Sequence, residues 1–238
     1  MNVAIIGYGK MGHVIEGILL ERGHKIGIII DVNNAADFRK ENFKDIDVAI
    51  EFTAPHTAYG NIIKCLEFGT PVVCGTTAWL DKYDDVVSEC KKNNGTFFYS
   101  SNYSIGVNLF SKMNTYLAKM MNAFSQYDVT MEEVHHTQKK DSPSGTAITL
   151  AEGILEGIDR KKTWVNQTTT NGDELEITSI RRSVVPGTHT ITWESPVDSI
   201  RIEHTAKGRE GFAVGAVLAA EFIKGRKGIF TMDDLLQL

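Results

Sequence analysis

The densest run of reactive side chains in this chain lies between residues 133 and 147. Two of the seven histidines and two adjacent lysines fall within six residues there: His135, His136, Lys139 and Lys140. Histidine and lysine donate protons to reacting groups when their surroundings tune their pKa values. A cationic cluster of this kind also suits a small substrate that carries more than one carboxylate. The residue types therefore predict acid–base chemistry on a small dicarboxylate.

The residues that follow predict how this cluster is held. Pro143 and Gly145 favour a turn, and Ser144 is suited to cap a helix. Backbone N–H groups at a helix start bind anionic oxygens, and the hydroxyl of Thr146 adds a donor. A histidine pair at a strand end is often only a surface feature, but a stable fold does not require so much positive charge beside this turn. We therefore interpret residues 133–147 as a site.

The spacing of histidines and cysteines argues against a metal. The adjacent histidines lie beside two glutamates, but the chain has neither an H-x-x-x-H pattern nor cysteines at metal-binding spacing. Cys65, Cys74 and Cys90 are odd in number, which disfavours a disulfide framework. We expect no bound metal and three reduced, mostly buried thiols.

A second group of residues predicts a dinucleotide site near the N-terminus. A G-x-G-x-x-G pattern follows an expected strand and opens an expected helix: Gly7, Tyr8, Gly9, Lys10, Met11 and Gly12. Its glycines permit a tight turn, a close approach of the backbone to a pyrophosphate, and close packing of helix on strand. Asp31 ends the next expected strand, where a carboxylate binds the ribose hydroxyls of NAD. In the alternative interpretation, the glycines form only a tight connection and Asp31 is a solvated turn residue. That interpretation does not explain why the glycines and the acid both lie where a dinucleotide-binding unit requires them.

Further cofactor contacts are expected where other strands end. Ligands of an open parallel sheet lie beyond the carboxyl ends of its strands. Small polar segments occupy those places. The first is residues 52–55, and the residues of the other two are Gly75, Thr76, Thr77, Ser100, Ser101, Asn102 and Tyr103. We expect these segments to border the cofactor rather than to be plain connections.

The elements that position these residues differ between the two halves of the chain. In the first half, short apolar runs alternate with helical stretches, which predicts a doubly wound α/β domain with a buried parallel sheet. The expected strands are 3–6, 26–30, 47–52, 71–74 and 96–99, and the expected helices are 12–22, 56–68 and 79–92. This half predicts a Rossmann-type domain.

The second half predicts a separate α+β domain with a mixed or antiparallel sheet. Its expected helices span 105–124, 144–158 and 212–224, and an alternating strand spans 127–134. Residues 174–183, 188–194 and 198–204 are expected to form successive antiparallel strands joined by tight turns at Pro186-Gly187 and Ser195-Pro196. A boundary near Gly106 is expected.

Composition excludes several classes of partner. Thirty acidic and 25 basic residues give a net charge of −5 and are mixed along the chain, so we expect no nucleic-acid partner. No apolar run approaches the roughly 20 residues that span a bilayer, and glycine at position 7 interrupts any leader-like apolar segment. We expect a cytoplasmic protein without a membrane partner.

The cluster and the glycine loop together resemble a known enzyme family. His135-His136 followed by Lys139 and the run from Asp141 to Ala147 is similar to the signature of the dihydrodipicolinate reductases. The resemblance extends over the whole chain, through residues 7–12, 75–77, 102–107, 212–216 and 228–234. Several long motifs in the right order make this match specific.

The resemblance implies a reaction and roles for residues. NAD(P)H would reduce C4 of 4-hydroxy-tetrahydrodipicolinate (dihydrodipicolinate), and a protein acid would protonate the adjacent carbon to give tetrahydrodipicolinate for lysine and diaminopimelate biosynthesis. His135 would be the proton donor or acceptor and Lys139 a proton donor, while His136, Gly145 and Thr146 would hold the substrate carboxylates. It also implies a homotetramer assembled through the second domain, residues 107–206, and a tail, residues 207–238, that completes the dinucleotide-binding domain of residues 1–106.

Some questions stay open at the level of sequence. Asp31 would repel a 2′-phosphate and is followed by Val32 rather than arginine, so we expect NADH to be preferred over NADPH. Thr137-Gln138 stands where many relatives of this family carry further basic residues, and the chain is short for the family. The competing hypotheses are a non-catalytic dinucleotide-binding protein and a semialdehyde-type dehydrogenase. The second would need a catalytic constellation other than the loop with His135, His136 and Lys139, such as a nucleophilic cysteine, and no cysteine here lies in a nucleophile motif.

Overall fold

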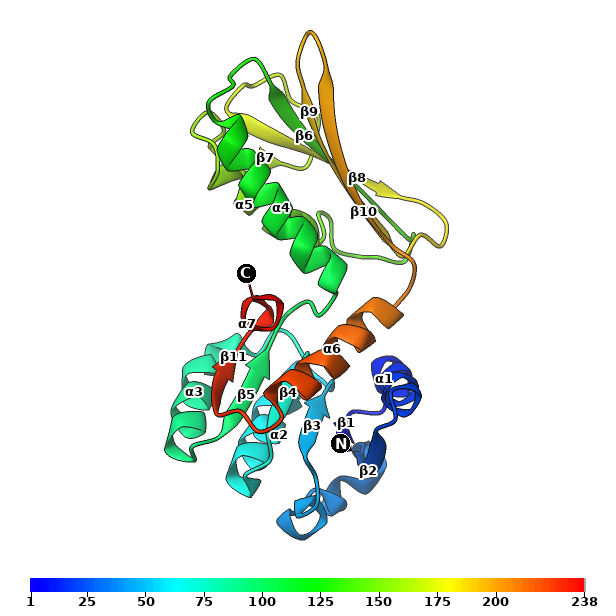
Figure 1. The fold of residues 1–238 in the computed structure, drawn as a ribbon. Helices are drawn as coiled ribbons and strands as arrows, with labels where there is room; N and C mark the ends of the chain where they lie inside the picture. The colour runs from blue at the N-terminus through cyan, green and yellow to red at the C-terminus, as the bar shows by residue number, and fades with distance from the viewer. Residues whose placement is uncertain (238) are drawn as a thin grey trace. The chain divides into compact units, whose positions relative to one another are not determined.

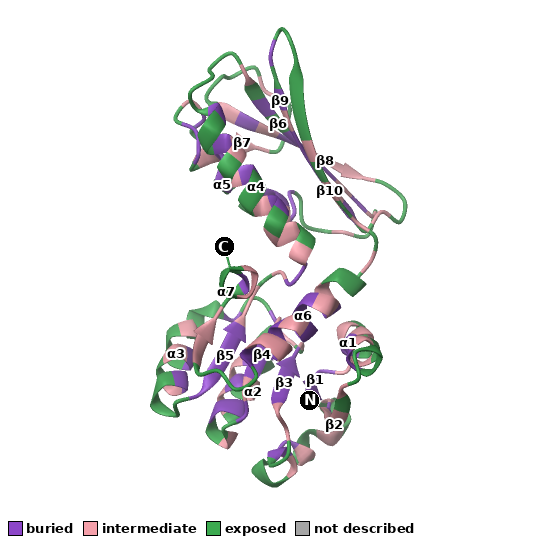
Figure 2. Cartoon of the chain, viewed as in Figure 1, coloured by how far each residue is buried: buried purple, intermediate pink, exposed green. Residues whose placement is uncertain are grey.

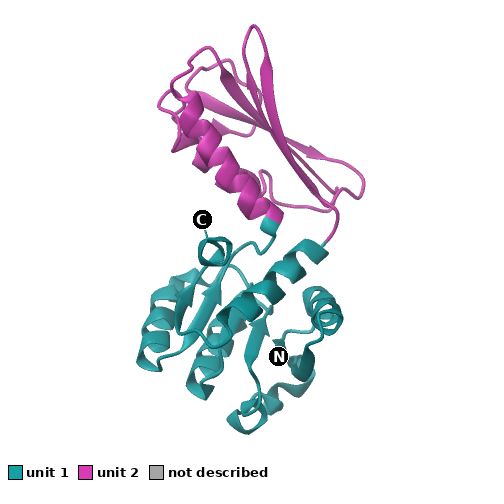
Figure 3. Ribbon diagram, in the orientation of Figure 1, with its two compact units in different colours: residues 1–105, 209–238 teal, residues 106–208 magenta. Residues whose placement is uncertain are grey.

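The computed structural model describes residues 1–237 and divides into two compact units. Unit 1 comprises Met1–Ile105 and Arg209–Leu238, and unit 2 comprises Gly106–Gly208 (Figure 3). The chain thus leaves unit 1 beside the boundary expected near Gly106 and returns to it with its last thirty residues. Within the described residues, no helix combines the length and the apolar character needed to cross a membrane.

Unit 1 is built on a parallel sheet with the strand order β11-β5-β4-β3-β1-β2 (Figure 1). The central strands are buried along almost their whole length because helices cover both faces of the sheet (Figure 2). The expected doubly wound α/β fold is confirmed. The strands are β1 (Asn2–Ile6), β2 (Lys25–Ile30), β3 (Val48–Glu51), β4 (Val72–Cys74), β5 (Thr96–Tyr99) and β11 (Gly228–Phe230).

The helices of unit 1 form two layers. α1 (Lys10–Glu21) and α6 (Glu210–Ile223) pack together on one face, where Leu19 and Val217 belong to a single buried cluster. α2 (Pro55–Phe68) and α3 (Tyr83–Lys92) cover the opposite face. Short 3-10 turns span Val32–Asp37, Lys40–Phe43 and Leu80–Lys82, and α7 (Met232–Leu236) ends the described chain.

The helix expected over residues 79–92 is shorter in the structure. Trp79 lies outside any helix because its indole is buried against Tyr83, Phe97 and Tyr99, with its N–H donating to the carbonyl of Thr76 at 2.7 Å. A 3-10 turn follows, and α3 begins only at Tyr83. Aromatic packing therefore decides where this helix starts.

Unit 2 contains a mixed sheet with the order β10-β9-β6-β8-β7. β6 pairs parallel with β8 and antiparallel with β9, and β9 and β10 form an antiparallel pair. The strands are β6 (Asp128–His135), β7 (Thr163–Val165), β8 (Glu174–Arg181), β9 (Gly187–Glu194) and β10 (Ser199–Ala206). The short edge strand β7 lies outside the strands expected from the sequence.

The expected meander of three successive strands is wrong in one respect. β8 and β9 are not neighbours, because β6 lies between them. The connection from β8 to β9 passes the end of β6, where the amide of Arg182 donates to the carbonyl of His135 at 2.8 Å. Strand β6 alternates buried and exposed residues and carries Val129 and Met131 into the core, so the central place in the sheet buries its apolar face best.

Helices α4 (Ile105–Met121) and α5 (Gly145–Leu155) pack on one face of this sheet. Phe110 of α4 and Leu150 of α5 join Met131, Ile191 and Trp193 of the strands in one buried cluster. Towards the end of β6 the same face changes from apolar to polar, because Glu133 and His135 continue the buried alternation. This change marks the place of the second candidate site.

Candidate active site

The carboxyl ends of β1, β2 and β3 in unit 1 enclose a cavity of about 420 Å³. Gly7, Tyr8 and Gly9 line it after β1, Asp31 after β2, and Thr53 after β3. Helix α1 starts at Lys10 with Gly9 in the capping position, so its first amides are not capped by a side chain. A helix start of this kind favours an anionic group such as a phosphate.

The three glycines of the loop have different surroundings. Gly7 adopts a φ of +95°, and a Cβ there would lie 2.1 Å from the carbonyl oxygen of Phe52. A Cβ on Gly12 would lie 2.4 Å from the oxygen of Gly7, whereas a Cβ on Gly9 would meet no described atom within 4 Å beyond its chain neighbours. The outer glycines are therefore required by packing, and the middle one leaves space for a ligand.

The cavity is lined by side chains of opposite charge. Asp31 is held by Asn34, whose side chain accepts from the Asp31 amide at 2.7 Å and donates to the carbonyl of Ile29 at 2.8 Å. Lys64, on α2, lines the same cavity, with its Nζ 5.0 Å from the centre of the Phe38 ring. Sequence reasoning missed Lys64 because it lies in a different helix with no motif around it.

The other segments expected to border the cofactor lie at the ends of β4 and β5 and do not line this cavity. Thr76 supports the neighbouring strand end, since its hydroxyl accepts from the amide of Thr53 at 2.8 Å. Tyr103 is buried, and its hydroxyl donates to the carbonyl of Cys74 at 2.7 Å. The other residues that were expected to contact the cofactor but do not line this cavity are Lys10, Met11, Gly12, Gly75, Thr77, Ser100, Ser101 and Asn102.

A buried carboxylate lies beneath the cavity. Glu51, the last residue of β3, accepts hydrogen bonds from the thiol of Cys74 at 3.1 Å and the amide of Asn61 at 3.3 Å, and it contacts the hydroxyl of Thr53. Burial, and then the charge of Glu51, raises the pKa of the Cys74 thiol well above its usual value. All three cysteines are buried and unpaired, which agrees with their expected state.

In unit 2 the strand register assembles a polar cluster on the helix-covered face of the sheet. Glu133 and His135 are two residues apart on β6, so they lie on the same face. Glu133 is directly opposite His189 of β9 and Ser179 of β8. The next position on that face pairs His135 with Arg181. Three neighbouring strands thus contribute to the cluster.

The carboxylate of Glu133 is wholly buried and richly hydrogen-bonded. It accepts from the Ser144 amide at 3.1 Å on each oxygen, from the Ser179 hydroxyl at 2.8 Å and from Arg181 Nη2 at 3.1 Å. Burial alone would raise the pKa of Glu133, but hydrogen bonds led by those from His135 and Ser144 hold it well below its usual range. The carboxylate is ionised at neutral pH.

The two buried histidines meet through their Nε2 atoms. These atoms lie 3.4 Å apart, and each faces the same oxygen of Glu133, at 3.4 Å from His135 and 3.7 Å from His189. His135 Nδ1 lies 3.2 Å from the carbonyl oxygen of Pro186, and His189 Nε2 lies 3.2 Å from the hydroxyl of Ser144. Burial, and then the proximity of His135, lowers the pKa of His189 to about 4.

The loop after β6 is joined to this cluster. Ser144 caps α5 by accepting from the Ala147 amide at 3.2 Å, as the sequence predicts. Lys139 Nζ lies 2.9 Å from a carboxylate oxygen of Asp141, and Arg181 donates to the Asp141 carbonyl at 2.6 Å. Arg181 therefore links the lysine-bearing loop to Glu133. Gly145 and Thr146 form the first turn of α5 beside the cap.

Known proteins match both units in this order. The model of the dihydrodipicolinate reductase N-terminus matches residues 1–103, and that of the C-terminus matches residues 106–236. A 4-hydroxy-tetrahydrodipicolinate reductase of Christiangramia forsetii is 49% identical over 236 residues, covering 99% of this chain and 98% of the relative. The chain belongs to the dihydrodipicolinate reductase family.

More distant comparisons agree on the fold. A 4-hydroxy-tetrahydrodipicolinate reductase of Thermosipho africanus is 32% identical over 239 residues, which cover 100% of this chain and 98% of the relative. A solved dihydrodipicolinate reductase with bound dipicolinate, from a Paenisporosarcina species, has a TM-score of 0.78 at 23% identity and covers 97% of both chains. At that identity the solved structure supports the fold alone.

The dihydrodipicolinate reductase fold brings some expected residues together and adds others. His135, Lys139, Gly145 and Thr146 are connected through Arg181, Asp141 and the Ser144 cap, while His136 lies half-buried just beyond the end of β6. Sequence reasoning missed the roles of Glu133, Arg181 and His189. The signal for Glu133 was the period-two alternation, which places it on the apolar face of β6. Arg181 and His189 carry no local signal.

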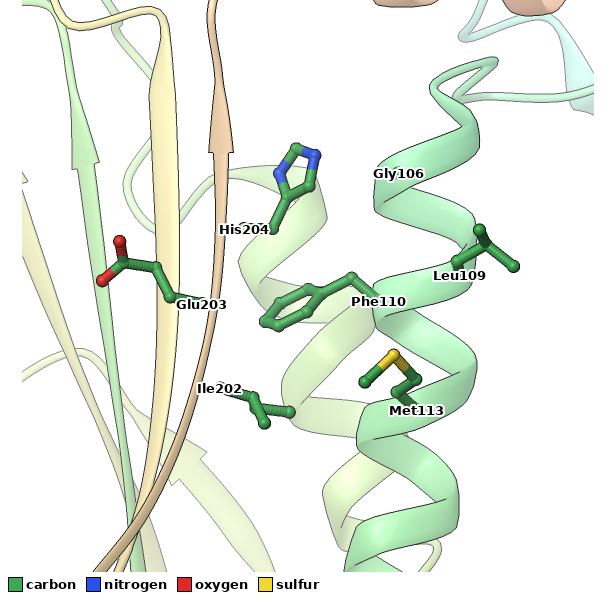
Figure 4. A pocket seen from close by; sticks show the side chains of 7 residues that line it. All are labelled: Gly106, Leu109, Phe110, Met113, Ile202, Glu203 and His204. Atoms are coloured by element: carbon green, nitrogen blue, oxygen red, sulfur yellow. The ribbon is translucent and has the colours of Figure 1, made fainter.

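Unit 2 has a cavity of about 310 Å³ between α4 and β10 (Figure 4). Phe110 and Met113 of α4 and Ile202 of β10 make its lining largely apolar. Burial lowers the pKa of His204 at its rim. Neither His135 nor Lys139 lines this cavity, so it is separate from the cluster around Glu133.

Proposed function

We propose that this protein reduces 4-hydroxy-tetrahydrodipicolinate to tetrahydrodipicolinate with a nicotinamide dinucleotide, a step of lysine and diaminopimelate biosynthesis. The observation that carries the proposal is the cluster at the end of β6, where His135 and the Lys139 loop meet the capped start of α5. Histidine, lysine and free helix amides suit a dicarboxylate that must also receive a proton. The family to which the chain belongs supports this reaction.

Unit 1 fits a dinucleotide. The open position at Gly9, the α1 start and the Asp31 carboxylate lie around one cavity, as a pyrophosphate and an adenosine ribose require. When bound, the dihydronicotinamide supplies a hydride, the two-electron part of the reduction. The loops at Gly75–Thr77 and Ser100–Tyr103 are proposed to border it, since they follow neighbouring strands of the same sheet.

Unit 2 supplies the proton and holds the substrate. The amides of Gly145 and Thr146, together with His136, bind the two carboxylates. Loss of water from the 4-hydroxy compound gives a conjugated ring that accepts hydride at C4, and the adjacent carbon then takes a proton from Lys139 or His135. Lys139 is only partly exposed and is paired with Asp141, so a substrate carboxylate can displace that contact and bring the ammonium group to the reacting carbon.

We propose that NADH is preferred over NADPH. Asp31 lines the cavity, and its negative charge would repel a 2′-phosphate. Lys64 lines the same cavity and would attract that phosphate. The opposing charges lead us to expect a modest preference with use of both cofactors.

We also propose a cytoplasmic homotetramer assembled through unit 2, with the dicarboxylate as its small-molecule partner and no nucleic-acid or membrane partner. Val197, just before β10, and Ile200, within β10, are exposed apolar side chains. A contact between the sheets of neighbouring copies would cover them. Light scattering coupled to size-exclusion chromatography tests the tetramer. A monomer at micromolar concentration would contradict it.

A coupled assay tests the reaction. Purified protein receives the product of a dihydrodipicolinate synthase reaction, and the absorbance of NADH or NADPH is followed. We expect oxidation of both cofactors, faster with NADH. A protein that binds NADH but oxidises neither cofactor is a non-catalytic dinucleotide-binding protein, and that result would overturn the proposal.

A further inference from the structure

Three potential metal ligands converge in the buried cluster of unit 2. The Nε2 atoms of His135 and His189 and the Oε2 atom of Glu133 are separated by 3.4, 3.4 and 3.7 Å. All three side chains are buried, and their ligand atoms form one compact group. The neighbouring His136 does not belong to this group. His189 comes from another strand, directly opposite Glu133.

The distances between these three ligand atoms match those expected between the ligands of a tetrahedrally coordinated metal ion. Zinc binds imidazole nitrogen and carboxylate oxygen at about 2.0–2.2 Å, so two ligands at a tetrahedral angle lie about 3.3–3.5 Å apart. Two of the three distances fall in this range, and the third exceeds it by 0.2 Å or so, as expected from the same bond lengths with a slightly wider angle. An ion at the centre needs only small movements of side chains.

The surrounding hydrogen bonds orient the lone pairs towards one another. A hydrogen bond from His135 Nδ1 to the carbonyl of Pro186 leaves the Nε2 lone pair of a neutral ring facing the cluster. The Ser144 hydroxyl accepts from Ala147 and can donate to His189 Nε2. The contact of His135 Nδ1 lies on the far side of the ring from Nε2 and is typical of metal sites, whereas Ser144 contacts the Nε2 atom of His189 itself. Without a metal, a proton on His135 Nε2 lies between this ring and the Glu133 carboxylate. When a metal ion displaces that proton, two imidazole nitrogens and one carboxylate oxygen face the ion.

The remaining charges allow this cation. Arg181 Nη2 and the Ser179 hydroxyl bind Oε1 of Glu133, whereas both histidines face Oε2. The carboxylate therefore stands between the guanidinium and the proposed ion. Two imidazoles and one carboxylate favour zinc and its neighbours in the transition series over magnesium or calcium, which prefer oxygen ligands.

We propose that Glu133, His135 and His189 form a binding site for a divalent transition-metal ion such as Zn²⁺, and that the bound ion inhibits the enzyme. A water molecule, or the hydroxyl of Ser144, completes the coordination. The inhibition follows because a metal-bound His135 Nε2 cannot exchange a proton, and this clause rests on the proposed function. Binding itself does not depend on that function.

Equilibrium dialysis of the full-length, tag-free protein against Zn²⁺ or Co²⁺ tests the binding. We expect one ion per chain and, for Co²⁺, the intense visible absorption of a tetrahedral site. His189→Ala and His135→Ala should lose both signals. His204→Ala, which alters a histidine of the cavity between α4 and β10, and His136→Ala, which alters the residue next to His135, should keep them. Binding lost in His136→Ala but kept in His189→Ala overturns the proposed ligand set.

Thermal unfolding separates lost binding from lost structure. Zn²⁺ should raise the Tm of the wild-type protein and of His204→Ala, because a ligand that binds only the folded state stabilises it. It should leave the Tm of a folded His135→Ala variant unchanged. A wild-type protein whose Tm and cobalt spectrum do not respond has a cluster that holds a proton rather than a metal, and this outcome overturns the proposal.

The activity assay addresses inhibition. Micromolar Zn²⁺ should reduce turnover at least tenfold, EDTA should restore it, and Mg²⁺ should have no effect. Active enzyme that binds no ion contradicts the metal site and leaves the proposed function standing. Stoichiometric binding in a protein without reductase activity contradicts the proposed function and leaves the metal site standing.

Discussion

The dinucleotide cavity of unit 1 and the polar cluster of unit 2 are built in different ways. The cavity is formed where successive parallel strands end, with Gly7 and Gly9 of the loop after β1 in its lining. The cluster is formed by charged and polar side chains on the helix-covered face of a sheet, and its strands are distant in the sequence. A cavity of the first kind depends on the path of the backbone, whereas a cluster of the second kind depends on each side chain satisfying the others.

This difference predicts how each site responds to substitution. Removing one member of a buried hydrogen-bonded network leaves its partners without hydrogen bonds in a medium of low polarity. Removing one side chain from the cavity of unit 1 leaves few buried polar groups without a partner, and the path of the backbone that forms the cavity stays the same. Four pairs of variants test this contrast.

Lys139→Ala carries the largest expected effect. Loss of a general acid reduces kcat by about 10²–10⁴-fold. Lys140→Ala is the matched control, since Lys140 is an exposed neighbour in the same loop. Steady-state kinetics with NADH measure both. Turnover of Lys139→Ala within a few-fold of wild type would show that another group, with His135 the first candidate, donates the proton.

Glu133→Ala should destabilise the folded state most. It leaves the Arg181 guanidinium, the Ser179 hydroxyl and the Ser144 amide without their acceptor, which costs about 3–5 kcal/mol of unfolding free energy. Glu132→Ala changes the adjacent exposed carboxylate and should cost less than about 0.5 kcal/mol. Urea denaturation measures both values. Equal losses in the two variants would contradict the role of the buried network.

Gly7→Ala and Gly9→Ala should separate stability from cofactor binding in unit 1. Gly7→Ala forces a left-handed φ on alanine and a clash with Phe52, at a cost of about 1–3 kcal/mol or more. Gly9→Ala has space for its methyl group in the free protein, so it should leave the Tm near wild type and weaken NADH binding about tenfold or more. Thermal unfolding and fluorescence titration with NADH distinguish the two effects. Unchanged NADH affinity in Gly9→Ala would exclude a close approach of the cofactor at this glycine.

Asp31→Ala and Lys64→Ala should shift cofactor preference in opposite directions. We expect the ratio of kcat/KM for NADH to that for NADPH to fall about tenfold in the first and to rise by a smaller factor in the second, because Asp31 is partly buried whereas Lys64 is exposed. The ratio is measured with both cofactors at the same ionic strength. A ratio that Asp31→Ala leaves unchanged would contradict the argument from the 2′-phosphate.

Sequence reasoning was most accurate where a function depends on neighbouring residues. The run from Gly7 to Gly12 and the cap at Ser144 are local, and the structure has the tight turn and the side-chain cap that they predict. The buried parallel strands of unit 1 were also predictable, since wholly apolar runs between helices have few other solutions. The start of α3 was not predictable, because it depends on how Trp79 packs against aromatic residues of β5.

Residue types and spacing were enough to predict the parallel α/β fold of unit 1, the glycine turn, and the cationic loop that leads into α5. The folded structure was needed to show that β6 lies between β8 and β9, and therefore that residues of these two strands, Arg181 and His189, flank Glu133. It also brought Lys64 and Asp31 into the lining of one cavity. The physical reason is the range of the interactions. Turns and caps depend on adjacent residues, whereas strand order reflects a competition among distant pairings that is settled by which arrangement buries the apolar faces and satisfies the buried polar groups.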